Sequence, residues 1–132
     1  MNKLGKYFDL SEMIRTGTGL INKPDKKEEH NLQLLVENVL DPLRELYGKP
    51  IKVNSGYRSK LVNADVGGAK NSDHLYGFAA DITAGSKNEN KKLFELIRDN
   101  FQYKQLINEY DYSWVHVSFD VKNNKKQILV IK

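Results

Sequence analysis

Apolar residues recur at spacings of three and four along residues 26–50, the pattern of one buried face of an amphipathic helix. The stripe consists of Leu32, Leu35, Val36, Val39, Leu40, Leu43 and Leu46. Gly48 is expected to end this helix. Pro42 lies inside the pattern, so the sequence predicts either a kink at this residue or a second short helix that begins there.

A second amphipathic helix is predicted over residues 86–100, where Ser86 or Asn88 is suited to the N-cap position. Its buried stripe is expected to consist of Leu93, Phe94 and Ile97. The Gly-rich and Asn-rich segment 55–71 is predicted to hold at most a turn or two of helix, around Lys60–Ala64. Strand character is found in five segments, which are 51–54, 78–83, 103–109, 113–120 and 126–132.

The order of these elements predicts an α+β fold, since helices dominate the first half and strands the second. The last two strands are separated by the turn-like segment 121–125, so we expect them to form an antiparallel hairpin. We predict a central antiparallel sheet with helices packed on one side. The chain of 132 residues has the length of one domain with one core, so the domain is placed at residues 1–132.

The composition limits the chemistry that the chain can carry. It has no cysteine, so disulfides and thiolate metal sites are excluded, and any metal must be held by histidine and carboxylate. A net charge of +4 suits an anionic partner, such as nucleic acid or a bacterial wall polymer. No apolar run reaches membrane-spanning length, and residues 1–10 lack the apolar core of a secretory signal. We therefore expect cytoplasmic synthesis and no membrane insertion.

Candidate metal ligands come from two of the predicted strands and one loop. Alternation in segment 113–120 places Val115, Val117 and Phe119 on one face, and Trp114, His116 and Ser118 on the other. Asp81 follows an apolar run, and a buried carboxylate needs a partner. Together with His74 and His116 it makes two imidazoles and one carboxylate, a complete ligand set for a catalytic zinc.

Each of these residues also has an ordinary structural interpretation. His74 alone, in a Gly-rich loop, could be a surface histidine, and His116 alone could be a hydrogen-bonded strand residue. Asp81 alone could cap a turn. His30, between two polar residues at the start of the long helix, is interpreted as solvated and without a role.

The motifs "SGYRS" (55–59), "VGG" (66–68), "SDHLYGFAADI" (72–82) and "WVHVSF" (114–119) occur in this order, with an Asn at position 63. They resemble the zinc D-Ala-D-Ala carboxypeptidases and their phage endolysin relatives, peptidase family M15. The pattern of that family is Ser-x-His-x-x-Gly-x-Ala-x-Asp followed by a later Trp-x-His. The matching residues are Ser72, His74, Gly77, Ala79, Asp81, Trp114 and His116.

The resemblance also extends to the opening "YFDLSEMIRT" and to residues 36–59, which are similar to a short, prophage-borne branch of the family. It implies a Hedgehog/DD-peptidase-like fold, and one zinc ion per chain bound by His74, Asp81 and His116. It further implies that Arg58 and Ser72 contact substrate. The planar guanidinium of Arg58 suits a peptide carboxylate or the oxyanion of a tetrahedral intermediate.

The general base is where this sequence departs from the family. Many relatives place a carboxylate three residues before the second histidine, but here that position is Ser113. If residues 110–113 form a hairpin turn, Glu109 lies opposite Trp114 and diagonal to His116, roughly 7–8 Å away between backbones. Glu109 is therefore our candidate base. Asp111 is the second choice, although it also suits a turn residue.

These observations predict a zinc metallopeptidase that hydrolyses an amide bond of peptidoglycan stem peptides, as a carboxypeptidase or as an endolysin-type endopeptidase. Peptidoglycan or muropeptide is the expected partner, nucleic acid is not, and a monomer is expected. Action at the cell wall after release is predicted, by a route that the sequence leaves open. Two alternatives remain: a catalytically silent zinc-binding module of the same family for wall or phage-structural binding, and a basic nucleic-acid binder.

Overall fold

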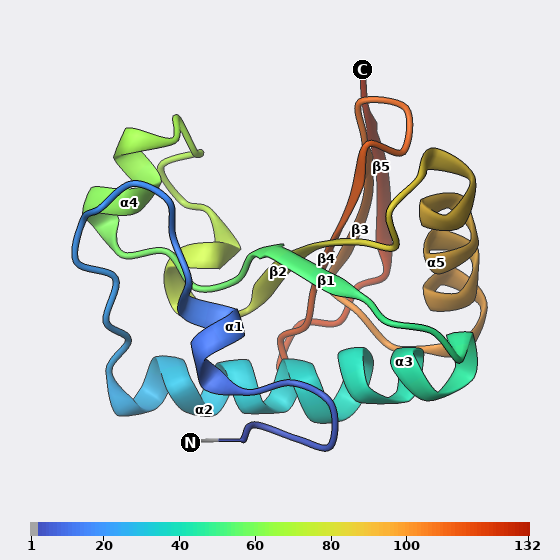
Figure 1. Ribbon diagram of the computed structural model, residues 1–132, viewed down its shortest axis with the longest axis horizontal. Helices are drawn as coiled ribbons and strands as arrows, with labels where there is room; N and C mark the ends of the chain where they lie inside the picture. Colours follow the sequence, from blue (N-terminus) through green and yellow to red (C-terminus); the bar gives the residue numbers. More distant parts are fainter. Residues whose placement is uncertain (1–2) are drawn as a thin grey trace.

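A five-stranded sheet runs through the computed structural model, which describes residues 3–132 (Figure 1). In spatial order its strands are β1 (Lys52–Ser55), β2 (Ala79–Thr83), β4 (Trp114–Ser118), β3 (Gln105–Glu109) and β5 (Gln127–Ile131). Neighbouring strands pair antiparallel except β3 and β5, which are parallel. The sheet is therefore mixed, and the α+β prediction is confirmed.

The hairpin expected between the last two strands is wrong. Both edges of β4 are occupied, one by β2 and the other by β3. The last segment therefore crosses to the free edge of β3, where Gln105 lies opposite Gln127 and Glu109 opposite Ile131. Local alternation identified β5 as a strand, but its partner depended on which sheet edge remained open.

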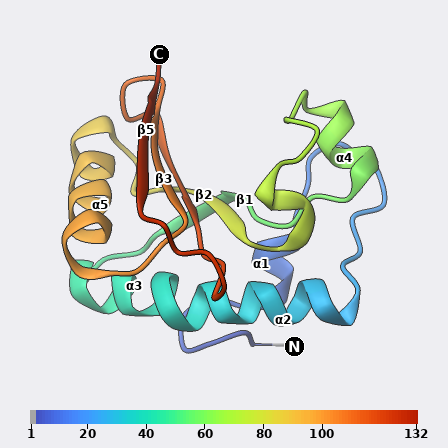
Figure 2. The same cartoon turned by 180° about the vertical axis from the view of Figure 1, so that it is seen from behind.

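A nearly continuous helical rod forms the base of the molecule in Figures 1 and 2. It consists of α2 (Lys26–Leu35), a π-helical turn η1 (Val36–Leu40) and α3 (Asp41–Tyr47). Pro42 lies in the first turn of α3, where its missing N–H does little harm, and the wide π turn precedes it. The second of the two predictions for Pro42 is thus the closer one. Gly48 caps α3 at a φ of 80°, as expected.

Three shorter helices and one long helix complete the fold. Ser86 is the N-cap of α5 (Lys87–Asn100), and its hydroxyl accepts the Glu89 N–H. The short α4 (Lys60–Asp65) confirms the helix predicted in the Gly-rich segment. Two elements were not predicted from the sequence, the helix α1 (Leu10–Ile14) and the 3-10 turn η2 (Asp73–Tyr76).

One face of the sheet packs against the helices, and the other face carries the polar side chains. The core face is formed by Val53, Ala80, Ile82, Leu106, Val115 and Val117, together with the apolar stripes of the long rod and of α5. Every predicted member of these stripes is buried except Leu46, which is 52% exposed. Helices on one side of the sheet were predicted and are observed. Across residues 3–132, none of the helices combines the length and the apolar character needed to cross a membrane.

Candidate functional site

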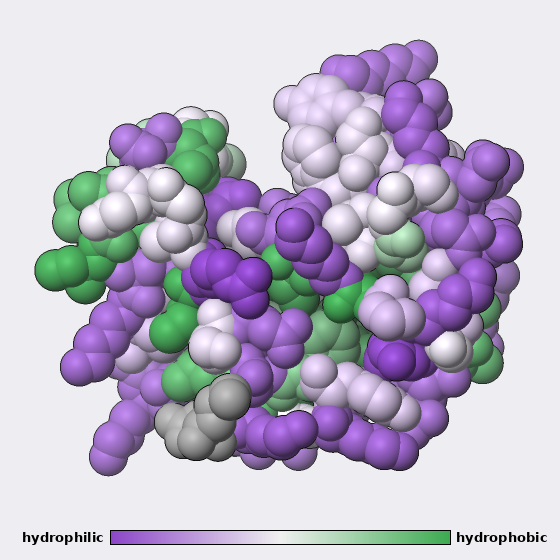
Figure 3. Space-filling model, viewed as in Figure 1, coloured by the Kyte–Doolittle hydropathy of each residue, from purple (hydrophilic) through white to green (hydrophobic). Residues whose placement is uncertain are grey.

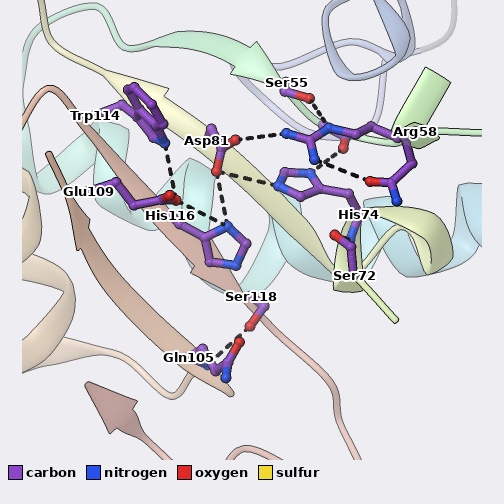
Figure 4. Close-up of polar contacts among 12 residues, drawn as sticks. Ser55, Arg58, Ser72, His74, Asp81, Gln105, Glu109, Trp114, His116 and Ser118 are labelled. Atoms are coloured by element: carbon purple, nitrogen blue, oxygen red, sulfur yellow. Dashed lines mark hydrogen bonds and ion pairs between the residues drawn. The ribbon is translucent and has the colours of Figure 1, made fainter. Parts of the chain in front are cut away.

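Three side chains converge on the polar face of the sheet, as Figure 4 shows. His74, Asp81 and His116 are all buried, and each offers one ligand atom within 4.8 Å of the others. The Nε2 of His74 lies 3.4 Å from Oδ1 of Asp81, and the Nδ1 of His116 lies 3.0 Å from the same oxygen. The fold thus brings together residues that lie 42 positions apart in the chain.

The register of the sheet places Asp81 beside His116. The two residues are directly opposite one another in the β2–β4 pair, and Ser55 of β1 lies opposite Asp81 on its other side. Residues that face each other across antiparallel strands point to the same side of the sheet. The alternation predicted for segment 113–120 is confirmed, because Val115, Val117 and Phe119 are in the core while His116 is outside it.

His74 is presented by the 3-10 turn η2 rather than by a strand. The Ser72 hydroxyl caps this turn by accepting the His74 backbone N–H, and Gly77 ends it at a φ of 79°. A side chain at Gly77 would also collide with the backbone carbonyl of Glu28 in α2. The Nδ1 of His74 lies 2.6 Å from the carbonyl oxygen of Gly56, a contact that fixes the ring and turns Nε2 toward Asp81.

The side chain of Arg58 is largely buried and contacts the candidate metal ligand Asp81. Its Nη2 donates to Oδ2 of Asp81 at 3.2 Å, on the oxygen that does not face the histidines. Its Nε donates to the Ser55 hydroxyl and its Nη1 to the Asn63 amide oxygen. The guanidinium is therefore held on three sides, with only 15% of the side chain exposed. Neither Asn63 nor Ser55 was predicted from the sequence to have a role in the site.

The charges around Asp81 control its protonation. Burial alone would raise the pKa of Asp81, but the adjacent His74 and His116 outweigh this effect, and the net pKa lies below its ordinary value. The carboxyl group is consequently held as a carboxylate, which is the form that accepts hydrogen bonds and binds cations.

Glu109 lies at the end of β3, opposite Trp114 as the predicted register requires. Its Oε2 accepts a hydrogen bond from the Trp114 indole N–H at 3.1 Å and lies 4.0 Å from Nδ1 of His116. Burial raises the pKa of Glu109, and the negative charge of Asp81 raises it further. The site therefore contains two carboxyl groups of opposite behaviour: the pKa of Asp81 is lowered, and the pKa of Glu109 is raised.

The remaining predicted positions lie further out. Asp111 is on the turn after β3 with 83% of its side chain exposed, and its carboxylate is 3.6 Å from Lys87. The Ser113 hydroxyl donates to the Tyr110 carbonyl within the same turn. His30 is exposed on α2, consistent with its interpretation as solvated.

An ion pair between Asp73 and Lys104 supports the site from outside, and the sequence analysis did not anticipate it. The two groups are 2.7 Å apart, and their side chains are only 10% and 20% exposed. Asp73 precedes His74 in η2, and Lys104 precedes β3. The pair therefore links the turn that presents His74 to the strand that presents Glu109. No pattern in the sequence could identify it, because single Asp and Lys residues are common on surfaces.

The space-filling view of Figure 3 shows a hollow between the region of α4 and the strands β3 and β5. Apolar side chains gather over α4 on one side of it. Leu61 of α4 and Val66, which follows this helix, are 62% and 51% exposed. The other side of the hollow is more polar in this view.

Two comparisons relate the chain to known proteins. The family model described as Peptidase M15 matches residues 6–118. Over 49 residues, the chain is 55% identical to the zinc D-Ala-D-Ala carboxypeptidase of Streptomyces albus G. This match covers 36% of the chain and 19% of that protein, so the similarity spans about a fifth of the length of this relative.

Proposed function

Because the chain belongs to the Peptidase M15 family, we propose that it is a zinc metallopeptidase that hydrolyses an amide bond in peptidoglycan stem peptides. The observation that carries this proposal is the convergence of His74, Asp81 and His116, with the carboxyl group of Glu109 beside them. The name of the Streptomyces relative supports both the metal and a peptide that ends in D-Ala-D-Ala.

The three converging residues fit zinc by their chemistry. Imidazole nitrogen and carboxylate oxygen are both common zinc ligands, and three protein ligands are the number typical of catalytic sites. His74 has its Nδ1 engaged by Gly56, which leaves Nε2 for the metal. His116 would use Nδ1, and Asp81 would use Oδ1. When bound, zinc would supply a Lewis acid that polarises the scissile carbonyl and lowers the pKa of water.

Glu109 is the proposed general base. Its carboxylate would take a proton from the attacking water and deliver it to the leaving amine. The indole N–H of Trp114 orients one carboxylate oxygen, and the other remains available. A raised pKa brings a carboxyl group closer to the operating pH, where proton transfer in both directions is efficient. Asp111 has neither the burial nor the position for this role.

Arg58 and Ser72 are the proposed substrate contacts. The guanidinium of Arg58 lies against Asp81, so a negative charge that develops on the substrate beside the metal would lie near a fixed cation. The Ser72 oxygen accepts a hydrogen bond from His74, which leaves its hydroxyl hydrogen to donate to a peptide carbonyl. Both residues would bind and orient the substrate without taking part in proton transfer.

Metal analysis combined with hydrolysis tests the proposal. We expect about one zinc per chain in the wild type and none in His116→Ala, and we expect the wild type to cleave a muropeptide whose stem ends in D-Ala-D-Ala. Release of free D-Ala would identify a carboxypeptidase, and release of a larger fragment an endopeptidase. Absence of zinc after incubation with zinc would overturn the metallopeptidase assignment.

One observation favours a second function, a catalytically silent zinc-binding module of the same family. The position three residues before His116 is Ser113, where many relatives carry a carboxylate. A wild type that holds zinc and binds peptidoglycan, but cleaves no stem peptide, would establish this alternative.

A further inference from the structure

The turn between β3 and β4 has an unusual backbone. Tyr110, Asp111 and Tyr112 have φ values of 53°, 55° and 59°, so three consecutive residues adopt the left-handed conformation. None of them is glycine. Residues with a side chain disfavour this conformation, most of all when several consecutive residues adopt it. Such a turn persists only where surrounding contacts hold it, and strained backbone of this kind is concentrated at functional sites.

The side chain of Asn90, in α5, makes hydrogen bonds that hold the turn in place. Its Nδ2 donates to the carbonyl oxygens of Tyr112 at 3.0 Å and of Ser113 at 3.2 Å. Its Oδ1 accepts the backbone N–H of Ala84 at 2.6 Å and the hydroxyl of Thr83 at 3.1 Å. The side chain is fully buried, so one amide group connects the end of β2 to the turn.

The turn is also fixed by its own residues. The backbone N–H of Tyr112 donates to the side-chain oxygen of Asn108 at 2.6 Å. The ring of Tyr112 packs edge-on against Phe94 of α5, with ring centroids 5.7 Å apart. Tyr112 thus packs against the core, while Tyr110 stays 50% exposed.

The strained turn lies directly between two residues of the site. Glu109 precedes it and Trp114 follows it, and the two side chains are hydrogen-bonded to each other (Figure 4). The ring of Tyr110 lies against Trp114, with centroids 5.2 Å apart. A change in the turn would therefore move the Glu109 carboxylate relative to His116.

We propose that Asn90 is a positioning residue, which fixes the left-handed turn 110–112 and through it the orientation of Glu109 beside the metal ligands. Asn90 itself does not belong to the cluster of His74, Asp81 and His116. The kinetic part of this inference rests on the proposed function, but its structural part can be tested on a protein without activity.

Asn90→Asp is the most selective variant. The change keeps an oxygen for the Ala84 N–H but places a second oxygen against the carbonyls of Tyr112 and Ser113, so it breaks only the contacts with the turn. The chain contains one tryptophan, Trp114, whose emission reports the environment of the turn directly. We expect a shifted Trp114 emission in folded Asn90→Asp, and unchanged emission in Asn100→Ala, a control on the exposed end of the same helix.

The kinetic expectation is a drop in kcat of about 10-fold to 100-fold, with KM and zinc content unchanged, because the base is displaced while the metal ligands stay in place. A purely structural role predicts a lower melting temperature with normal kcat per folded chain. Normal emission and normal kcat in Asn90→Asp would overturn the proposal.

Asp111→Gly provides a rescue. Glycine adopts a positive φ at little cost, and the Asp111 side chain is exposed, so this change should favour the left-handed turn. In Asn90→Asp/Asp111→Gly we expect the wild-type emission and most of the kcat to return. Failure of the rescue in a folded double variant would show that Asn90 does not act through the turn. A wild type that lacks zinc and activity would refute the proposed function, whereas the emission results would still decide the role of Asn90.

Discussion

The two sides of the site are built in different ways. Arg58, His74 and Asp81 come from one segment of 24 residues, in which a loop, the short helix α4, a 3-10 turn and a strand follow one another. Glu109 and His116 come instead from two paired strands joined by a left-handed turn. On the first side the residues lie in short local motifs, although the sheet register also sets the place of Asp81. On the second side their place depends on strand register and on contacts from α5.

Glycine shows the same difference. On the first side, Gly77 adopts the left-handed conformation next to the carbonyl of Glu28, where no side chain fits. Gly68 is also constrained, since a side chain there would collide with the Asn63 side-chain amide and lie close to Arg58. On the second side, the left-handed residues are two tyrosines and an aspartate. The first side therefore has a recognisable motif, and the second has a strained turn stabilised by tertiary contacts.

The largest effect is expected from Asp81, the residue of the first side that also contacts His116 of the second. Asp81→Asn keeps the shape of the side chain but removes the negative charge that faces both imidazoles. We expect the bound zinc to fall from about one per chain to near zero, and hydrolysis to fall to background. Elemental analysis and a stem-peptide assay measure this. Asp65→Asn, on the exposed side of α4, is the control and should change neither value.

Removal of a base on the second side should separate catalysis from metal binding. Glu109→Gln keeps an acceptor for the Trp114 indole but cannot take a proton, so kcat is expected to fall about 10²-fold to 10⁴-fold with zinc retained. Asp111→Asn should leave kcat unchanged, because that side chain is exposed. If Asp111→Asn is inactive and Glu109→Gln is active, the two carboxylates have been assigned in the wrong order.

Metal removal tests how much the stability of the folded protein depends on zinc bound between the two sides of the site. Chelation removes the metal from the buried carboxylate of Asp81 and leaves it with Arg58 and the two histidines as partners, so the apo protein should melt at a lower temperature. If free zinc exceeds its Kd about 100-fold, the loss is about 2.7 kcal/mol, which corresponds to roughly 10 °C for a domain of this size. Differential scanning fluorimetry with and without chelator measures the shift. Equal melting temperatures would mean that the ligand cluster binds no metal.

Two substitutions compare the left-handed residues directly. Gly77→Ala should destabilise the protein by about 1–2 kcal/mol or more, since it adds both an unfavourable φ and a collision with Glu28. Asp111→Gly should stabilise it by up to about 1 kcal/mol, because glycine relieves an unfavourable φ. Gly17→Ala is a control with an ordinary φ and open space around it. Unfolding in urea measures all three, and a stabilised Gly77→Ala would contradict the comparison.

The proximity of the first-side residues could be predicted from the sequence. His74, Asp81 and Arg58 lie in short motifs, the strand alternation placed His116 on the polar face, and the assumed turn at 110–113 gave the register of Glu109. The helical stripes and all five strands were also predictable, because each depends on local periodicity. Leu46 is the exception, since it lies in the last turn of α3 and is exposed.

The parts that the sequence did not reveal depend on long-range contacts. The parallel pairing of β5 follows from which sheet edge is free, and no local pattern contains that information. Asn90 looked like an ordinary polar residue near the start of a helix, yet its amide joins β2 to the turn after β3. The left-handed turn contains no glycine, so the usual signal for a positive φ was missing.

The smallest expected effect concerns the attachment of α5, the helix that supports the second side. The Glu89 carboxylate accepts hydrogen bonds from Tyr47, Lys49 and Lys92. Lys92 contributes most to lowering the pKa of Glu89 to about 2, and Tyr47 and Lys49 add to it.

Since the pKa of this group is depressed in the folded state, its contribution to stability is complete above the ordinary carboxyl pKa and is lost as the pH falls toward 2. Glu89→Gln should therefore lower the melting temperature slightly at pH 7, and the difference from the wild type should shrink at pH 4 and again at pH 3. Because Asn90 follows Glu89 directly, a shifted Trp114 emission in Glu89→Gln at pH 7 would show that the first turn of α5 moves as a unit with the turn it supports. Unchanged emission would show that Asn90 holds the second side of the site independently of how the helix is anchored to α3.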